Sequence, residues 1–94
     1  MKKDFLVVSY DITDDKRRRK LVKHMEQNGV RVQKSVFECL WNEKKYIKLR
    51  AKIEEIIDMK EDSVRYYILC ARCVDRVKVS GSGTVLTEQK EIVV

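Results

Sequence analysis

The chain has 94 residues, of which 44% are apolar, and a formal net charge of +6 from 21 Lys and Arg against 15 Asp and Glu. The apolar content excludes a disordered chain, and the length fits one domain close to the lower size limit for an independent core. The sequence contains no long apolar span and no lipidation signal, so the positive balance favours nucleic acid over a membrane as partner.

The first predicted element is a strand from Phe5 to Tyr10 that is apolar on both of its alternating faces. This pattern is typical of a central strand that is covered on both sides. The strand runs into Asp11, and a helix is predicted to follow. Its N-cap is Thr13 or Asp14, and Asn28-Gly29 is the predicted left-handed stop.

Three consecutive arginines, Arg17, Arg18 and Arg19, lie in the first turns of this helix. A carboxylate such as Asp11 beside guanidinium groups at a strand-to-helix junction can hold a divalent cation and a phosphate together. Arg18 falls on the inward stripe of the helix, so it should have a partner, because burying an unpaired guanidinium is costly. That partner is either a bound phosphate or Asp11, unless the side chain extends past the helix end into solvent.

The middle of the chain predicts a pair of strands and a second helix. Val30 to Val32 begins a strand, and Val36 to Trp41 forms a third strand or its continuation, with Gln33 to Ser35 as either a bulge or a tight bend. Apolar residues spaced three and four apart then predict a helix from about Glu43 to Ile57, capped by Asn42.

A fourth strand from Val64 to Ala71 completes the order strand, helix, strand, strand, helix, strand. This is the order of the ferredoxin-like α+β sandwich, in which both helices cover one face of an antiparallel sheet. The second face is left bare, although the central strands are apolar on both sides. A second copy of the chain is the simplest cover, since a two-fold interface buries the same patch on both copies, so we expect a homodimer.

The ferredoxin-like domain is expected to occupy residues 1–80, with Val77 to Ser80 as a candidate short strand. Residues 81–94 begin with a flexible joint, Gly81-Ser82-Gly83, and end in the apolar Ile92-Val93-Val94. An apolar terminus after a flexible joint predicts an additional C-terminal strand that joins a sheet edge in the partner subunit or in another protein. The alternative is a frayed end.

Three cysteines, an odd number, are expected to be reduced thiols. Cys70 and Cys73 have ligand-like spacing, but zinc needs four ligands, and on a strand these two thiols would face opposite sides. His24, on the flank of the first helix, is expected to be solvated. Only a short apolar run follows Lys2 and Lys3, so we expect no signal peptide and a cytoplasmic location.

Several short stretches in combination resemble the CRISPR-associated protein 2 family of small endoribonucleases. They are Tyr10-Asp11-Ile12, Lys16 to Arg19, Gly29 to Gln33, Ser35 to Glu38 and Asp62 to Tyr67. The resemblance covers nearly the whole chain. It implies a homodimer whose first-strand aspartates meet across the two-fold axis. It also implies metal-dependent cleavage of RNA or double-stranded DNA, and bridging of the CRISPR integrase while new spacers are captured.

Carried over by residue, the resemblance makes Asp11 the catalytic and metal-binding position. Positions near the site or its nucleic-acid surface are matched by Tyr10, Arg18, Arg31 and Phe37. Mg²⁺ or another divalent cation would take one carboxylate from each subunit and activate a water, with Arg18 or Arg31 neutralising phosphate oxygens.

Two functions are therefore expected. The first is a metal-dependent endonuclease that uses paired Asp11 residues, with Arg17 and Arg19 adding to its nucleic-acid surface. The alternative is a non-catalytic, basic dimer that binds duplex DNA and acts only as a structural adaptor of the integrase. Asp11 is the only acid expected to point into the site, because Asp14 and Asp15 fit helix-cap roles. A more distant third interpretation is an RNA-cleaving toxin of similar fold.

Overall fold

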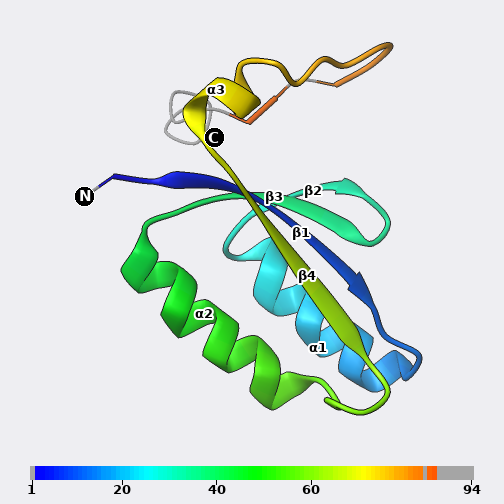
Figure 1. Cartoon of the computed structure of the whole chain (residues 1–94). Helices are drawn as coiled ribbons and strands as arrows, with labels where there is room; N and C mark the ends of the chain where they lie inside the picture. The colour runs from blue at the N-terminus through cyan, green and yellow to red at the C-terminus, as the bar shows by residue number, and fades with distance from the viewer. Residues whose placement is uncertain (1, 84, 87–94) are drawn as a thin grey trace.

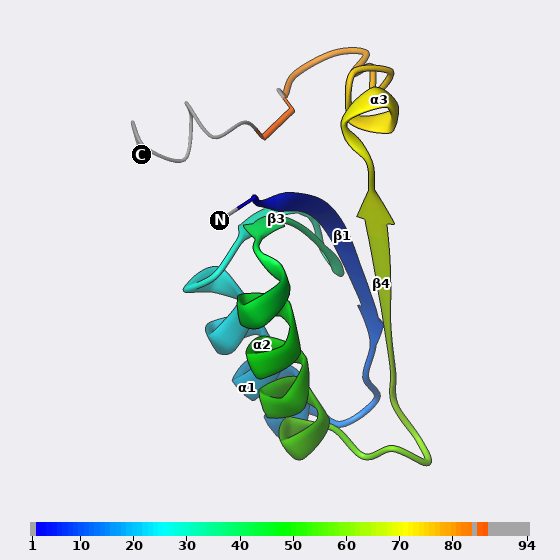
Figure 2. The same ribbon diagram turned by 60° about the vertical axis from the view of Figure 1, so that its left-hand side comes forward.

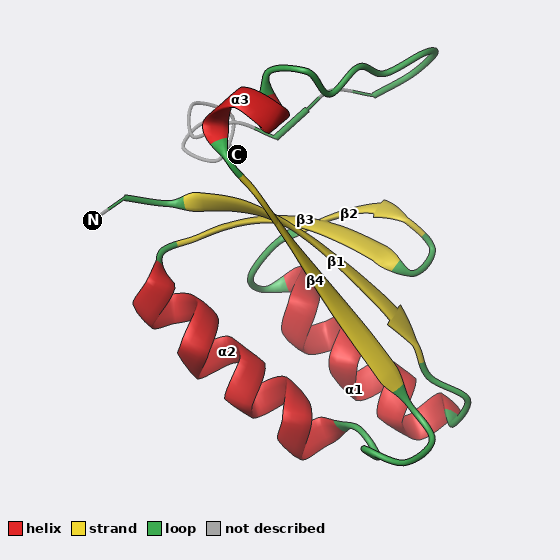
Figure 3. Ribbon diagram, in the orientation of Figure 1, coloured by secondary structure: helices red, strands yellow, loops and turns green. Residues whose placement is uncertain are grey.

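The structure, a computed structural model, describes residues 2–83 and 85–86. Its elements in chain order are β1 (Asp4–Asp11), α1 (Asp15–Glu26), β2 (Val30–Gln33), β3 (Val36–Trp41), α2 (Glu43–Ile56), β4 (Ser63–Leu69) and α3 (Ala71–Val74). The four strands form one antiparallel sheet in the order β2-β3-β1-β4 (Figures 1 and 3). This topology confirms the predicted ferredoxin-like α+β fold. No helix of the described residues is long and apolar enough to cross a membrane.

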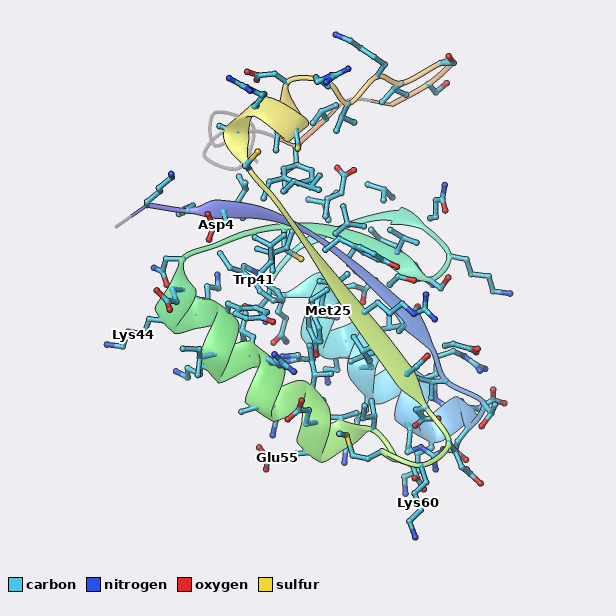
Figure 4. All side chains as sticks on the ribbon, viewed as in Figure 1. Asp4, Met25, Trp41, Lys44, Glu55 and Lys60 are labelled. Atoms are coloured by element: carbon cyan, nitrogen blue, oxygen red, sulfur yellow. The ribbon has the colours of Figure 1, made fainter. Side chains whose placement is uncertain are left out.

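The main core lies between the sheet and the two long helices, which pack on the same face (Figure 2). Leu6 and Val8 of β1 meet Leu21 of α1 and Ile53 of α2 in this layer, and all four are at most 1% exposed. Figure 4 shows Met25 and Trp41 between the sheet and the helices, whereas the labelled Lys44, Glu55 and Lys60 point outward. Burial of this one face of each amphipathic helix is what holds the layers together.

Both helices begin at the residues that the sequence indicates. The Asp14 carboxylate accepts a hydrogen bond from the Arg17 amide at 2.9 Å, and Asn42 Oδ1 accepts one from the Lys45 amide at 2.8 Å. Each cap satisfies an amide that has no partner within its own helix.

The end of α1 differs from the expected left-handed stop at Asn28-Gly29. The helix ends at Glu26, and among the described glycines only Gly81 and Gly83 have a positive φ. Asn28 closes the helix through its side chain, whose Nδ2 donates to the His24 carbonyl at 2.9 Å. Gly29 is needed for a different reason, because a Cβ there would lie 2.6 Å from Cys39 Sγ and 3.0 Å from the Glu38 carbonyl oxygen.

The β2–β3 segment contains both of the alternatives that the sequence left open. Two separate strands are joined by a turn at Lys34 and Ser35, and the strand register shifts between Arg31 and Gln33 as in a β-bulge. Bulges of this kind increase the local twist of a strand. α1 contacts β2 as well as packing on β1.

After β4 the chain departs from the prediction. The strand ends at Leu69 instead of Ala71, and the residues 77–80 that were expected to form a short strand have no regular structure. The chain turns into α3, whose Val74 packs with Val85 and Leu86 against Phe5 and Leu40 on the second sheet face. The chain therefore covers one end of that face itself. The expected C-terminal strand falls on residues 84 and 87–94, outside the described part.

A buried ion pair joins the start of α1 to the turn before β4. Asp62, the one charged residue classed as buried in the described part of the chain, accepts from Arg17 Nε at 2.8 Å and from the Asp58 amide at 2.9 Å. Arg17 also reaches the exposed Glu61 at 3.4 Å. The hydrogen bond from Arg17 is the main reason that the pKa of Asp62 lies below its ordinary value, against the opposing effect of burial.

Asp62→Asn is expected to lower the free energy of unfolding near neutral pH by about 1–2 kcal/mol, because charge-assisted hydrogen bonds are lost. A carboxyl group whose pKa is lowered by folding stabilises the fold above its unfolded pKa, and this contribution disappears as the pH falls through its folded pKa. Urea unfolding at a series of pH values should therefore show a weaker acid dependence in the variant than in the wild type.

Glu61→Gln is the matched control, since it removes only the exposed partner of Arg17 and should change stability by less than about 0.5 kcal/mol. Two results would contradict the stabilising role of the Arg17–Asp62 ion pair. One is an equal loss of unfolding free energy in the two variants, and the other is an acid dependence of stability in Asp62→Asn that matches the wild type.

Gly29→Ala should destabilise the protein by about 1–3 kcal/mol, because the new methyl group overlaps Cys39 Sγ and presses on the Glu38 carbonyl. In a Cys39→Ala background the same substitution should cost less, since the sulfur is gone. A double-mutant cycle measured by urea unfolding tests this, and an identical cost in both backgrounds would show that the sulfur contact is unimportant.

Candidate functional site

A cavity of about 900 Å³ lies between α1 and the β2–β3 hairpin, next to the end of β1. It is lined by Tyr10, Asp11, Ile12, Arg18, Arg19, Val22, Lys23, Glu26, Arg31, Lys34 and Ser35. The structure thus brings five of the predicted site residues together, namely Tyr10, Asp11, Arg18, Arg19 and Arg31. Arg17 and Phe37 do not line it.

Phe37 lies behind the cavity. Its side chain is fully buried, and its ring packs at a tilt against that of Tyr10, with 6.3 Å between the centroids. The expected contact between Phe37 and nucleic acid is not available in this arrangement, because no part of the ring reaches the surface. Phe37 instead supports Tyr10, which is itself only 6% exposed.

Tyr10 and Arg31 both hold the turn of the β2–β3 hairpin. The Tyr10 hydroxyl donates to the Lys34 carbonyl at 2.8 Å, and the same carbonyl accepts from Arg31 Nη2 at 2.7 Å and from Nε at 3.2 Å. One oxygen therefore links the central strand, the edge strand and the turn. Arg31 is thus anchored through Nε and Nη2, and it also lines the cavity.

The three consecutive arginines have three different environments. Arg17 is engaged by Asp62, whereas Arg19 is exposed on the cavity wall. Arg18 donates from Nη1 to the Ile12 carbonyl at 3.0 Å and from Nη2 to the Asp15 carboxylate. The expectation that Arg18 has a partner is confirmed, although neither of these partners is Asp11. Arg18 fixes the loop that connects Asp11 to α1.

Asp11 is exposed at the end of β1, where its backbone pairs with Ser63. Mg²⁺ is usually held by one or two carboxylates together with waters and substrate phosphates, so Asp11 suits such an ion as a single ligand. Within the described residues no three His, Cys, Asp or Glu side chains come close enough to form a complete metal site. A carboxylate in such a position suits an ion that is shared with a phosphate or with a further carboxylate.

Glu26 and Lys23 line the cavity but were not predicted for the site. Helical spacing contains the signal for them: Arg18, Val22 and Glu26 follow one another at intervals of four, and so do Arg19 and Lys23. Lys34 and Ser35 offer no such signal, because they reach the cavity through a turn of the hairpin.

A second, smaller hollow of about 360 Å³ lies between α1 and α2. Lys20, Lys23 and Lys52 line it together with His24. His24 is not solvated as expected, since its Nε2 is buried and has no hydrogen-bond partner in the described structure. Burial is the main reason that its pKa is lowered, and the nearby Lys52 adds to the effect, so the ring is neutral at neutral pH.

Comparison with known proteins gives consistent matches. A family model described as CRISPR associated protein Cas2 matches residues 4–77. The CRISPR-associated endoribonuclease Cas2 2 of Synechocystis sp. is 48% identical over 81 residues, which cover 84% of this chain and 86% of that relative. The crystal structure of Streptococcus pyogenes Cas2 at pH 6.5 has a TM-score of 0.71 and 34% identity, covering 82% of this chain and 99% of the other. A chain of a partial Cas6-RT-Cas1–Cas2 complex has a TM-score of 0.72 and 30% identity, covering 81% and 89% respectively.

Tyr10→Phe should lower the free energy of unfolding by about 0.5–1 kcal/mol, at the low end for a buried hydrogen bond, because Arg31 still satisfies the Lys34 carbonyl. Tyr67→Phe on the other sheet face, where the ring is 47% exposed, is the matched control and should have no measurable effect in urea unfolding. A loss in Tyr10→Phe no larger than that in the control would show that the link to the turn contributes nothing.

Proposed function

The chain belongs to the CRISPR-associated Cas2 family, and on that basis we propose that it is a CRISPR adaptation protein with metal-dependent endonuclease activity. Its substrate is RNA or double-stranded DNA, and it also bridges the CRISPR integrase during spacer acquisition. The relative found in a Cas1–Cas2 complex supports the second role.

The observation that carries the nuclease proposal is that Asp11, at the end of β1, lies at the edge of the cavity that Arg18, Arg19 and Arg31 also line. Glu26 also lines the cavity, so Asp11 is not its only acid as the sequence suggested. Carboxylates beside several cations match the needs of a phosphodiester, which presents anionic oxygens to arginine and shares a divalent cation with a carboxylate. Lys23 and Lys34 extend this positive wall along the cavity.

In this mechanism Asp11 would hold Mg²⁺ or another divalent cation, which would supply an activated water and polarise the phosphoryl group. Arg31 and Arg19 contact the phosphate oxygens and stabilise the charge that develops on them. Arg18 keeps the Asp11 loop in place through the Ile12 carbonyl, and Tyr10 fixes the hairpin that carries Arg31.

A homodimer would complete the ligand set. Alternation along β1 places Asp11 on the same side of the sheet as Phe5 and Val7, which is the second face. That face still exposes Tyr67 at 47% and Val30 at 45%, although α3 covers its other end. A second copy packed there would bury these side chains and bring a second Asp11 towards the first.

The alternative function, a non-catalytic adaptor that binds duplex DNA, is favoured by a different observation. The lysine-lined hollow between α1 and α2 is separate from Asp11, and the chain has a net charge of +6. Such a surface attracts phosphates without a metal and gives an affinity that falls steeply with salt.

Asp11→Ala should abolish cleavage of labelled RNA and duplex DNA in Mg²⁺, while Arg31→Ala should lower the rate about 100-fold through lost charge stabilisation. Both variants should keep most of their duplex affinity, measured by fluorescence anisotropy over a range of salt concentrations. Asp75→Asn, an exposed acid outside the cavity, is the matched control and should cleave as the wild type does.

Wild-type cleavage that persists in EDTA, or equal cleavage by wild type and Asp11→Ala, would exclude the Asp11 nuclease. Metal-dependent activity that is lost only in Asp11→Ala and reduced in Arg31→Ala would place the chemistry in this cavity. Duplex binding with no cleavage by any form of the protein would favour the adaptor.

A further inference from the structure

Two cysteines that were expected to face opposite sides of a strand come together at the end of β4. Because the strand stops at Leu69, Cys70 becomes the residue that precedes α3, and Cys73 lies inside that helix. One helical turn then brings the two side chains to the same side, with 3.4 Å between their Sγ atoms. The expectation that these thiols face opposite sides of a strand is therefore wrong.

Both thiols are open to reagents in solution. Cys70 and Cys73 are exposed, whereas Cys39 is fully buried in the main core. A disulfide bond joins sulfurs about 2.05 Å apart, so a small rotation of the side chains on one turn of chain is enough to close the remaining distance. Cys39, by contrast, has no second cysteine near it in the sequence.

The surroundings of the two thiols also make them unequal. Hydrogen bonding from the Cys73 amide is the main reason that the pKa of Cys70 is lowered, and the Cys73 thiol adds to it. The pKa of Cys73 is raised, chiefly by its hydrogen bond with Cys70. Cys70 is thus the first of the two to ionise, and a thiolate is the form that attacks a disulfide.

We propose that Cys70 and Cys73 form a reversible dithiol–disulfide pair whose oxidant is a low-molecular-weight disulfide such as oxidised glutathione. The Cys70 thiolate attacks one sulfur of the oxidant, forms a mixed disulfide and releases the first glutathione thiolate. The Cys73 thiolate then attacks the sulfur of Cys70, which closes the intramolecular disulfide and releases the second. The two cysteine protons are taken up by the two glutathione thiolates, and two electrons pass from the protein to the oxidant.

The disulfide would act on the packing of the second sheet face. Val74 follows Cys73 directly and packs, with Leu86, against Phe5 and Leu40. A disulfide between Cys70 and Cys73 would restrain the turn that places Val74 in this cluster. Oxidation should therefore lower the mobility of α3, which covers one end of the second sheet face, and reduction should raise it.

The sequence between the two cysteines provides a direct test. Trypsin cuts after Arg65, Arg72 and Arg76, so the two thiols fall on separate peptides, 66–72 and 73–76. The full-length protein is equilibrated in glutathione buffers of increasing oxidised fraction, alkylated, digested and analysed by mass spectrometry. The two peptides should be recovered joined under oxidising conditions and separate after reduction, with a loss of two of the three titratable thiols.

Cys70→Ser and Cys73→Ser are matched variants that should each abolish the joined peptide, and Cys39→Ala should leave it unchanged. Hydrogen exchange of the amides in α3 should slow several-fold on oxidation of the wild type, but not in either serine variant. Glutathione adducts on separate cysteines, or a joined peptide found only in covalent dimers on a non-reducing gel, would overturn the intramolecular pair. A disulfide that forms without slowing exchange would overturn its link to the Phe5 cluster.

Discussion

The ion pair between Arg17 and Asp62 connects the parts of the fold that surround the end of the central strand. Arg17 lies in the first turn of α1 and Asp62 directly precedes β4, so one contact of 2.8 Å joins the two elements next to Asp11. Removing one partner of such a pair leaves the other without compensation, which is more costly than losing a surface contact. This ion pair, together with the contacts of Arg18 to the Ile12 carbonyl and to Asp15, restrains the loop between Asp11 and α1.

The consecutive arginines divide their tasks because a helix turns by about 100° per residue. Arg17 faces Asp62, Arg18 faces the Ile12 carbonyl, and Arg19 faces the cavity. In the sequence the three arginines look like one basic site. In the structure Arg17 contributes to stability, Arg18 fixes the loop, and Arg19 is available for the proposed phosphate contact. Arg31 joins them from the hairpin, where the Lys34 carbonyl holds it beside Tyr10.

The two faces of the sheet are covered by different means. The helices cover one face and bury its centre at Leu6, Val8 and Phe37, and on the other face α3 with Val85 and Leu86 covers only the end at Phe5 and Leu40. The remaining surface is where we place the second copy of the chain. The paired thiols of Cys70 and Cys73 lie at the junction between β4 and this cover, so their oxidation state bears on how firmly the cover is held.

Local periodicity was sufficient to predict the four strands of the sheet, the two long helices and the ferredoxin-like order, and it narrowed the N-caps to Asn42 and to Thr13 or Asp14, whereas α3 was not predicted. These features depend on residues within a few positions of one another, where the alternation of a strand and the turn of a helix apply directly. The resemblance to the Cas2 family rested on the same short stretches, and the family was confirmed.

Only the tertiary structure decided which distant residues meet. Asp62 is 45 positions from Arg17, Gly29 is a glycine because Cys39 lies against it, and Phe37 is hidden beneath Tyr10. β4 likewise ends at Leu69, the chain turns so that Val74 packs with Phe5, and Cys70 and Cys73 come within 3.4 Å of each other at this turn. A periodic pattern tells which side of an element is buried, but the partner on that side is chosen by the packing of the whole chain.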